Sequence, residues 1–375
     1  MNFKINKNKF YSALSCTARA ISSNSPVPIL SGILLDVTKD KIVITGSDAT
    51  LSIQVTLSNA IDEETGLSVI DEGTIVIDAR YLLDIVKKID SDEISIEILD
   101  GTLTHFGGEK AEFKINGYRP VDYPAIDFNE PSLRFELSSE LLNSTITNTV
   151  FATSTKETRP VLTGVNMRAA DGLIICTATD SFRLSKKVIP VSCDPFSITV
   201  PSKALNEVRS IFTSNEAITV ALDERKIQFR TGSIILQSTL LEGSFPETDR
   251  LIPTQFNSTM IINRRSLISA IDRSSFIKTD NMTLIRMEIN AADDILVSSK
   301  SQEIGEYNES LTAVSYDGMP LDISFSGSYM SDALKALSTE NVKILFTEAM
   351  KPFVMYNDDG DESFLQLVLP VRTYN

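Results

Sequence analysis

The sequence is poor in the residues that most enzyme active sites use. It has one histidine, His105, and three widely spaced cysteines, Cys16, Cys176 and Cys193, in 375 residues. A histidine in nucleophilic catalysis needs an oriented partner, and the FGG segment beside His105 indicates a surface or turn position in a hairpin region instead. An odd number of cysteines without a CxxC pair is typical of reduced thiols, so we expect neither a disulfide framework nor a zinc site.

Membrane, secretion and cofactor signals are also missing. No window approaches the roughly 18 consecutive apolar residues of a membrane-spanning helix, and no apolar segment follows the first lysines as it would in a signal peptide. There is no GxxxxGK[ST] phosphate loop and no GxGxxG after a strand. The acidic stretch YNDDGDES (356–363) lacks EF-hand spacing, so we expect a solvated hairpin turn there. These absences predict a cytoplasmic protein with no metal, no cofactor and no catalysis.

What the sequence does contain is a repeat. A chain of 375 residues with 42% apolar and 23% charged residues has the length for two or three domains with real cores. Three weakly similar stretches begin at Phe3 (FKINKNKFYSAL), Phe135 (FELSSELLNSTI) and Met260 (MIINRRSLISAI). Each has a short alternating strand, a polar residue suited to capping, and apolar residues at helical spacing.

A second set of segments repeats at the same period. TIVIDARYLLDIVKKI, SITVPSKALNEVRSIF and DISFSGSYMSDALKAL each predict a strand followed by an amphipathic helix. Their anchor residues Ile77, Val200 and Phe325 are 123 and 125 residues apart. Aromatic–proline turns recur at Tyr123-Pro124 and Phe245-Pro246. Because several features recur in one order, we interpret the chain as three copies of one unit.

Alternating segments such as EISIEIL (93–99), AITVAL (217–222), KIQFR (226–230), VKILF (342–346) and LQLVLPV (365–371) predict half-buried strands. The fold class is therefore α+β, with two helices packed on antiparallel sheets in each repeat. Breaks in the pattern near 125–133 and 248–258 indicate linkers. We expect three domains, at 1–127, 128–253 and 254–375.

The net charge of −15 argues at first against nucleic-acid binding. The charge is unevenly spread, however. Six predicted helical windows (6–23, 78–90, 138–156, 201–213, 263–279 and 327–340) together carry +6, which leaves −21 for the remainder. Helices tolerate Lys and Arg well, which is the simple explanation. The alternative is a weakly positive helical surface that faces the DNA backbone, with acidic sheets outside. The candidate DNA-facing residues are Lys7, Lys9, Arg19, Arg80, Lys87, Lys88, Lys203, Arg209, Arg264, Arg265, Arg273 and Lys335.

The whole chain resembles the beta sliding clamps of bacterial DNA polymerase III. The resemblance is most specific in PVPILSGILLDV (26–37), RPVLTGVNM (159–167), CTATDSFRLSKK (176–187), EGSFPETDRLIP (242–253) and LQLVLPVRTYN (365–375). It implies the DNA clamp fold and a closed ring of two chains arranged head to tail. Such a ring encircles duplex DNA without sequence preference, is loaded by an ATP-dependent clamp loader, and confers processivity.

The resemblance also implies a groove for short peptides bearing a Gln and a Leu/Phe pair, presented by the replicative polymerase, the clamp loader and repair proteins. Carried onto this sequence, the groove comprises Leu162, Thr179, Arg183, Leu184, Pro246, Arg250, Leu251, Pro352, Leu367, Val368, Leu369, Pro370, Val371 and Arg372. Leu, Val and Pro suit a dry pocket for apolar anchors, and arginines suit its rim. Each Leu or Val alone is equally consistent with an ordinary core position.

The implied dimer interface has Phe113 and Ile115 on one side and Phe276 and Ile277 on the other. Two departures from the family pattern concern binding. Ser181-Phe182 stands where the family commonly has Gly-His, which makes the groove rim more apolar. Asn24 stands where the family often has a basic residue, which weakens the expectation of a DNA contact there.

Two other interpretations compete with a clamp. One is a monomeric protein-binding module whose repeats build only a recognition surface. The other is an enzyme acting on a sugar or a nucleotide, which the absence of a convergent His, Cys or metal constellation disfavours.

Overall fold

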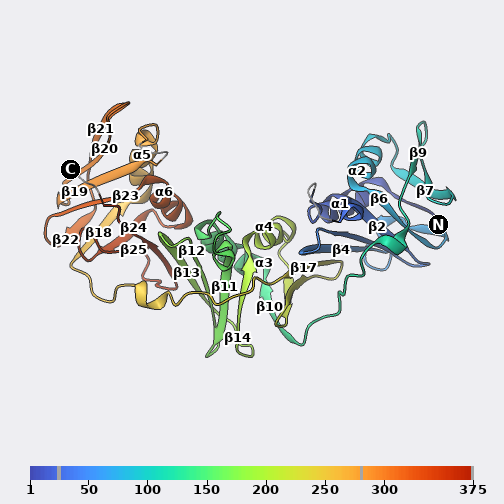
Figure 1. Cartoon of the computed structure of the whole chain (residues 1–375), viewed down its shortest axis with the longest axis horizontal. Helices are drawn as coiled ribbons and strands as arrows, with labels where there is room; N and C mark the ends of the chain where they lie inside the picture. The colour runs from blue at the N-terminus through green and yellow to red at the C-terminus, as the bar shows by residue number, and fades with distance from the viewer. Residues whose placement is uncertain (23–26, 279–281, 373–375) are drawn as a thin grey trace. The chain divides into compact units, whose positions relative to one another are not determined.

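The computed structural model describes residues 1–22, 27–278 and 282–372, so the predicted departure at Asn24 lies outside the described residues (Figure 1). The chain divides into two compact units. Unit 1 comprises Met1–Leu142 and Asn206–Leu240, and unit 2 comprises Asn143–Leu205 and Leu241–Asn375.

Each predicted repeat contributes one pair of α-helices to the described part of the chain. They are α1 (Lys7–Ala18), α2 (Ala79–Lys88), α3 (Ser139–Thr149), α4 (Ser202–Ile211), α5 (Arg264–Ser274) and α6 (Gly327–Ala336). All six windows are confirmed, but each helix is shorter than its window. After α1, for example, the N–H of Ala20 bonds to the carbonyl of Thr17, a tight turn that ends the helix.

The predicted capping residues begin the first helix of each repeat. The Asn6 side chain accepts hydrogen bonds from the N–H groups of Asn8 and Lys9. The Asn263 side chain accepts one from Ser266, and Ser138 Oγ accepts one from Leu141. These oxygens satisfy N–H groups that have no partner in the first helical turn, which is why each helix begins directly after its strand.

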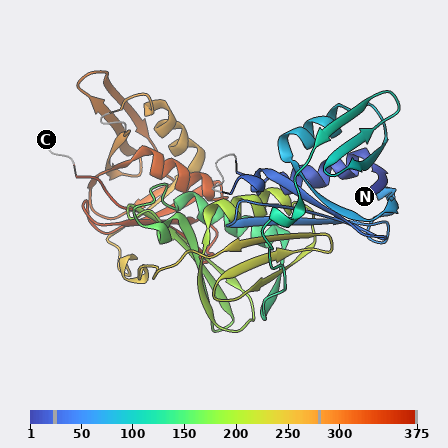
Figure 2. The same ribbon diagram turned by 45° about the vertical axis from the view of Figure 1, so that its right-hand side comes forward.

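Unit 1 contains two antiparallel sheets, of orders β5-β1-β7-β8-β9 and β10-β15-β16-β17-β4-β3-β2-β6. Helices α1 and α2 lie side by side in Figures 1 and 2, and α1 packs on β3 and β4. A Cβ added at Gly46 would lie 2.6 Å from the Thr17 carbonyl oxygen, so this contact requires glycine. The strands are β1 (Asn2–Asn6), β2 (Gly32–Val37), β3 (Ile42–Ser47), β4 (Leu51–Leu57), β5 (Ser68–Asp71), β6 (Gly73–Asp78), β7 (Glu93–Asp100), β8 (Leu103–Gly107), β9 (Glu112–Asn116), β10 (Leu133–Ser138), β15 (Ala217–Leu222), β16 (Lys226–Arg230) and β17 (Ile234–Thr239).

Unit 2 contains sheets of orders β14-β11-β12-β13-β26-β25-β24-β18-β22 and β21-β20-β19-β23. Its main core gathers apolar residues of α5, α6 and both sheets, including Leu267, Met330, Phe325 and Phe353. The strands are β11 (Gly164–Ala170), β12 (Leu173–Thr179), β13 (Arg183–Pro190), β14 (Phe196–Pro201), β18 (Ser258–Asn263), β19 (Leu284–Ala291), β20 (Asp294–Ser301), β21 (Gly305–Leu311), β22 (Ser315–Asp317), β23 (Leu321–Ser326), β24 (Asn341–Phe346), β25 (Phe353–Asn357) and β26 (Phe364–Val368).

The strand order repeats three times. One pattern appears as β1-β7-β8-β9, β10-β15-β16-β17 and β18-β24-β25-β26, and a second as β4-β3-β2-β6, β13-β12-β11-β14 and β21-β20-β19-β23. The repeats are joined where the last strand of the first pattern pairs with the first strand of the second, at β17–β4 and at β26–β13. This topology confirms the three copies inferred from the sequence. Strand β9 has the position in the first repeat that β17 and β26 have in the other two, and we call these strands the β9 class. Strand β21 likewise corresponds to β4 and β13, which form with it the β21 class. Both β9 and β21 are edge strands of their sheets.

The acidic segment 356–363 includes the turn between β25 and β26, as predicted. The Asp361 carboxylate accepts hydrogen bonds from the backbone and the hydroxyl of Ser363. Across the described ranges, no group of three or more His, Cys, Asp or Glu side chains is arranged to hold a metal ion. No helix in the described part of the chain is long and apolar enough to span a membrane.

Candidate functional site

The turn between β12 and β13 is fixed by its own side chains. The Asp180 carboxylate accepts hydrogen bonds from the N–H groups of Phe182 and Arg183, at 2.9 and 3.1 Å. Thr179 Oγ1 accepts one from the N–H of Ser181, whose φ of 81° is unusual for a residue other than glycine. With the turn held in this way, Phe182 projects from it with 57% of its surface exposed.

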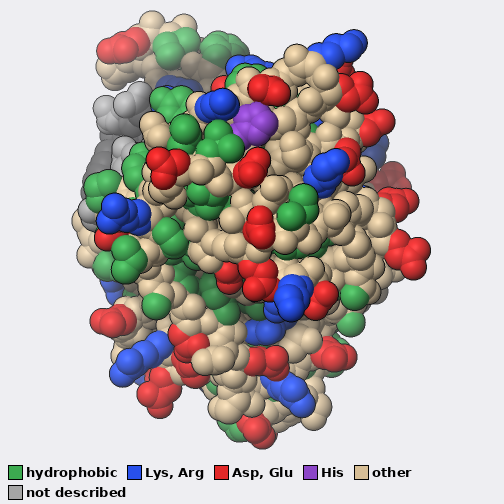
Figure 3. Space-filling model, turned by 90° about the vertical axis from the view of Figure 1, so that its right-hand side faces the viewer, with side chains coloured by type: hydrophobic (Ala, Val, Ile, Leu, Met, Phe, Trp, Pro, Cys, Tyr) green, Lys and Arg blue, Asp and Glu red, His purple; other side chains and the backbone are tan. Residues whose placement is uncertain are grey.

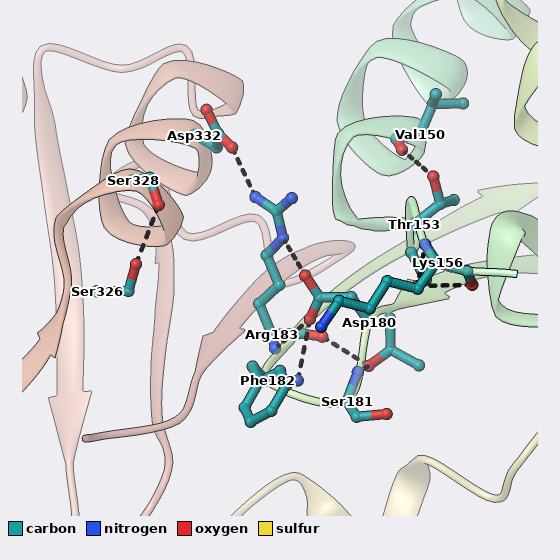
Figure 4. Close-up of polar contacts among 12 residues, drawn as sticks. Val150, Thr153, Lys156, Asp180, Ser181, Phe182, Arg183, Ser326, Ser328 and Asp332 are labelled. Carbon is teal, nitrogen blue, oxygen red and sulfur yellow. Dashed lines mark hydrogen bonds and ion pairs between the residues drawn. The ribbon is translucent and has the colours of Figure 1, made fainter. Parts of the chain in front are cut away.

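Arg183 is enclosed, contrary to the expectation of a rim residue. Its Nε donates to Asp180 at 3.0 Å and its Nη1 to Asp332 of α6 at 2.6 Å (Figure 4). Its guanidinium carbon lies 4.6 Å from the Tyr329 ring centroid and 5.5 Å from that of Phe151. With its side chain only 12% exposed, Arg183 holds the turn against α6 and does not project from a rim.

The C-terminal segment brings several predicted groove residues together. Strand β26 pairs with β13, so that Leu367 lies opposite Leu184 and Val368 opposite Arg183. The N–H of Leu369 donates to the carbonyl of Phe182 at 3.0 Å. Leu184 and Leu367 are buried in a small apolar cluster on which Leu369 packs half-buried. Strand β26 ends at Val368, so the predicted strand over 365–371 is too long. Pro370 continues in an isolated bridge to Phe325.

The other predicted groove residues lie on separate segments. Leu162 is buried in a short 3-10 helix, and Pro246 and Pro352 are half-buried in loops. Arg250 and Leu251 are exposed on the 3-10 helix Asp249–Leu251, where Arg250 lies 3.3 Å from Glu247. Val371 donates its N–H to the carbonyl of Ser324, and Arg372 is exposed.

Ion pairs of Asp249 with Lys186 and Arg168 hold the segment that carries Arg250. Asp249 accepts a hydrogen bond from Lys186 Nζ at 2.7 Å and lies 3.6 Å from Arg168. The hydrogen bond from Lys186, together with the two positive charges, keeps the pKa of Asp249 below its ordinary value. The linker is therefore attached to strands β11, through Arg168, and β13, through Lys186.

Many of the predicted DNA-facing cations already have partners. Lys9 pairs with Asp62 and Glu64, Arg19 with Glu207, Lys88 with Asp84, and Arg273 with Glu309. Lys7 donates to the carbonyl of Ile89, and Arg264 to those of Thr339 and Leu334. Arg80 lies over the ring of Tyr81, and Arg209 donates to Asn206. Lys87, Lys203, Arg265 and Lys335 are exposed on their helices.

The predicted interface residues fall into two groups. Phe113 and Ile115 are half-buried on the edge strand β9, and Phe276 is 64% exposed just after α5. Ile277 is only 1% exposed, because the chain turns inward after α5 and its N–H bonds to the carbonyl of Ser274. The expectation that Ile277 faces a partner is therefore wrong for this structure, and Phe276 carries that surface.

His105 lies on β8 and not in a turn. Its side chain is 20% exposed, and its Nε2 lies 3.6 Å from Glu112. Figure 3 shows the molecule's single histidine on a face where acidic and basic side chains are interspersed.

Four residues at the enclosed arginine were missed by the sequence analysis: Phe151, Asp180, Tyr329 and Asp332. One signal could have found two of them. Asp332 is the sixth residue of α6 and Glu207 the sixth of α4, and each forms an ion pair with an arginine. Tyr329 is the third residue of α6, as Tyr81 is of α2. Position within the repeat therefore carries functional information that composition does not.

Three antiparallel α+β repeats joined through continuous sheets, with a helix pair in each, define the class of DNA clamps. Family models described as the N-terminal, central and C-terminal domains of the DNA polymerase III beta subunit match residues 1–127, 136–247 and 249–372, respectively. The chain is 35% identical to the beta sliding clamp of Bacillus subtilis over 379 residues and to that of Staphylococcus aureus over 378, each covering 100% of both chains.

Solved structures give the same result. The DNA polymerase sliding clamp of Bacillus subtilis matches with a TM-score of 0.95 at 34% identity, covering 100% of both chains. The DNA polymerase III beta chain of Streptococcus pneumoniae matches with a TM-score of 0.95 at 34% identity, covering 99% of this chain and 100% of that one. The chain belongs to the beta sliding clamp family of DNA polymerase III, which is a family of non-catalytic polymerase subunits.

Proposed function

We propose that two copies of this chain close head to tail into a ring that encircles duplex DNA and tethers the replicative polymerase. The observation that carries this proposal is the pair of sheet edges β9 and β21. At both junctions inside the chain, a strand of the β9 class pairs with a strand of the β21 class, as β17 does with β4 and β26 with β13. One copy has one unused edge of each class, so β9 of one copy is matched by β21 of another.

Such a contact joins two different surfaces, and repeating it gives either a closed ring or an open filament. The family resemblance supports closure after two copies, with domains 1–127, 128–253 and 254–375 from each. Phe113 and Ile115 lie on β9 itself, which supports their place in this contact. Without closure, unpaired strand edges would promote uncontrolled association.

The DNA-facing surface in this proposal is the set of helices. Lys87, Lys203, Arg265 and Lys335 are its exposed cations, whereas Lys9, Arg19, Lys88 and Arg273 are largely neutralised by carboxylates. A surface whose cations are in part paired with carboxylates attracts phosphates weakly and reads no base sequence. This is the behaviour that a sliding protein needs.

The peptide groove is proposed on unit 2 around the β13–β26 pairing. Leu369, Pro370 and Val371 are half-buried, and Leu369 bonds to the exposed Phe182. Together they offer apolar surface for a Leu/Phe pair. Partners would be the replicative polymerase, an ATP-dependent clamp loader and repair proteins. No cofactor is needed, because the proposed role is tethering in the cytoplasm, on the nucleoid.

The test is retention on nicked circular DNA after loading by a matching clamp loader with ATP. Retention on the circle that disappears when the circle is cut would demonstrate topological linkage. Equal retention on circular and linear DNA would mean ordinary phosphate binding and would overturn the proposal. The rival monomeric binding module predicts no retention on either form and a monomer in sedimentation.

A further inference from the structure

The internal repeat makes equivalent positions at the domain junctions comparable. Arg19, Phe151 and Phe276 each stand thirteen residues after the capping residue of the first helix in their repeat. The residue that follows each is buried: Ala20 and Ala152 are 0% exposed and Ile277 is 1% exposed. The hydroxyl two residues before each of them, on Thr17, Thr149 and Ser274, donates back to a helix carbonyl. The three positions are therefore structurally equivalent.

At the first junction inside the chain, this position contacts the second helix of the following repeat directly, and at the second junction it is connected to that helix through an arginine. Arg19 pairs with Glu207, the sixth residue of α4. Phe151 lies against the guanidinium of Arg183, which also contacts Asp180, the ring of Tyr329 and the carboxylate of Asp332. Tyr329 and Asp332 are the third and sixth residues of α6. The second junction is thus a layered contact of phenylalanine, arginine and tyrosine beside a carboxylate.

A third junction, between two copies of the chain, would join the third repeat of one copy to the first repeat of the other, and matching residues are present in both repeats. The third residue of α2 is Tyr81 and the sixth is Asp84, which match Tyr329 and Asp332. Tyr81 is 52% exposed, and Phe276, the match of Phe151, is 64% exposed. Large aromatic side chains are enriched at protein–protein interfaces, so these two are candidates for a contact with a second copy.

An arginine also lies on the ring of Tyr81, as Arg183 lies on the ring of Tyr329. The guanidinium of Arg80 lies 4.7 Å from the centroid of the Tyr81 ring, and its Nη2 donates to the Tyr81 hydroxyl at 2.9 Å. The corresponding distance from Arg183 to the Tyr329 ring is 4.6 Å. Arg80 comes from α2 itself, whereas Arg183 is the first residue of β13, but each places a flat cation on the ring of the third helical residue. A guanidinium between two aromatic faces is favourable on both sides.

We infer that Phe276 of one copy docks on the Arg80–Tyr81 pair of a second copy, beside Asp84, and so closes the ring with the layered contact that Phe151, Arg183 and Tyr329 make within the chain. This inference rests on the proposed two-copy ring and specifies its interface. It moves Arg80 from the DNA-facing set to the interface, and it explains why Phe276 remains exposed while Ile277 is buried.

The experiment is sedimentation of the full chain across a concentration series, which gives the dimer dissociation constant. Tyr81→Ala and Phe276→Ala should each raise this constant roughly 10- to 100-fold, because a two-copy ring contains the contact twice. Arg80→Lys keeps the charge but loses the flat guanidinium, so it should also weaken the dimer. Met319→Ala, at a 77% exposed apolar residue of the same repeat as Phe276, and Lys41→Ala, at an exposed lysine of the same repeat as Tyr81, are the matched controls and should leave the constant unchanged.

The double variant Tyr81→Ala with Phe276→Ala separates contact from coincidence. If the two rings belong to one contact, the double variant should raise the dimer dissociation constant by clearly less than the product of the two single increases. Multiplicative effects would overturn the inference, as would single variants that dimerise like the wild type. An Arg80→Lys variant with a normal dimer and a defect only in DNA loading would return Arg80 to the DNA-facing set and also contradict it. A wild-type chain that is monomeric at every concentration would instead overturn the proposed ring.

Discussion

At the scale of single residues, Arg183 is the most constrained cation of the candidate groove. Two carboxylates and two aromatic rings surround its side chain. Because Asp180 has only 11% of its side chain exposed, removing the arginine leaves a poorly hydrated negative charge without compensation. The energetic role of Arg183 is therefore to make that burial tolerable and to join the β12–β13 turn to α6.

Replacing Arg183 by Met should lower the free energy of unfolding by about 2 kcal/mol, since a half-buried carboxylate pair loses its cation. Denaturant unfolding would measure this loss. Arg250→Met is the matched control, because the Arg250 side chain is 86% exposed and its loss should cost less than about 0.5 kcal/mol. Equal stabilities of the two variants would contradict the positioning role of Arg183.

Sequence alone could not separate these two arginines. Both belong to segments that carry the family resemblance, and both carry the same charge. The difference comes from Asp332, which is 149 positions away in the chain and reaches Arg183 only because β26 pairs with β13. The burial of Ile277 was not predicted either, although its cause is local: the turn after α5 places Ile277 inward and leaves its neighbour Phe276 exposed.

At the scale of elements, local patterns determine most of what forms. The caps Asn6 and Asn263, the alternating strands and the helix pairs were all predicted, because each depends on residues close in the chain. The ends of elements were less predictable. Strand β26 stops at Val368, although the apolar run continues to Val371, because Leu369 and Val371 bond elsewhere, to Phe182 and Ser324.

The linker from Asp249 onward is an element whose attachment depends on pH. Lys186 lowers the pKa of Asp249 in the folded chain, so this attachment contributes stability above the ordinary aspartate pKa of about 4. The contribution disappears as the pH falls through the lower folded value. Asp249 is largely solvated, so the effect should be at most about 1 kcal/mol.

The variant Lys186→Met should therefore be less stable than the wild type at pH 7, and the difference should shrink below pH 4. Urea unfolding midpoints at pH 7, 5, 4 and 3 would measure it. Lys300→Met, at an exposed lysine on β20, is the control and should follow the wild type at every pH. If the stability difference between the variant and the wild type grew as the pH fell, the stabilising role assigned to the Lys186–Asp249 pair would be contradicted.

At the scale of the whole molecule, charge is separated by element type. The predicted helical windows carry +6 and the remainder −21, yet salt bridges on α1 and α5 use part of that positive charge internally. The proposed DNA surface therefore depends on the few exposed cations outside such pairs. A long-range attraction of this kind is sensitive to salt.

Reversing three of these cations, with Lys87→Glu, Arg265→Glu and Lys335→Glu together, should lower loading onto nicked circular DNA several-fold at about 0.1 M salt. The dimer dissociation constant should remain unchanged, because the three residues lie on exposed helical faces outside the inferred interface. Lys41→Glu, Lys300→Glu and Lys351→Glu together change the net charge equally at exposed lysines outside the helices. If net charge alone governs loading, the two triple variants will fall together. If the helices face the DNA, only the first will fall, and its deficit will grow as the salt concentration is lowered, since screening no longer hides the lost attraction.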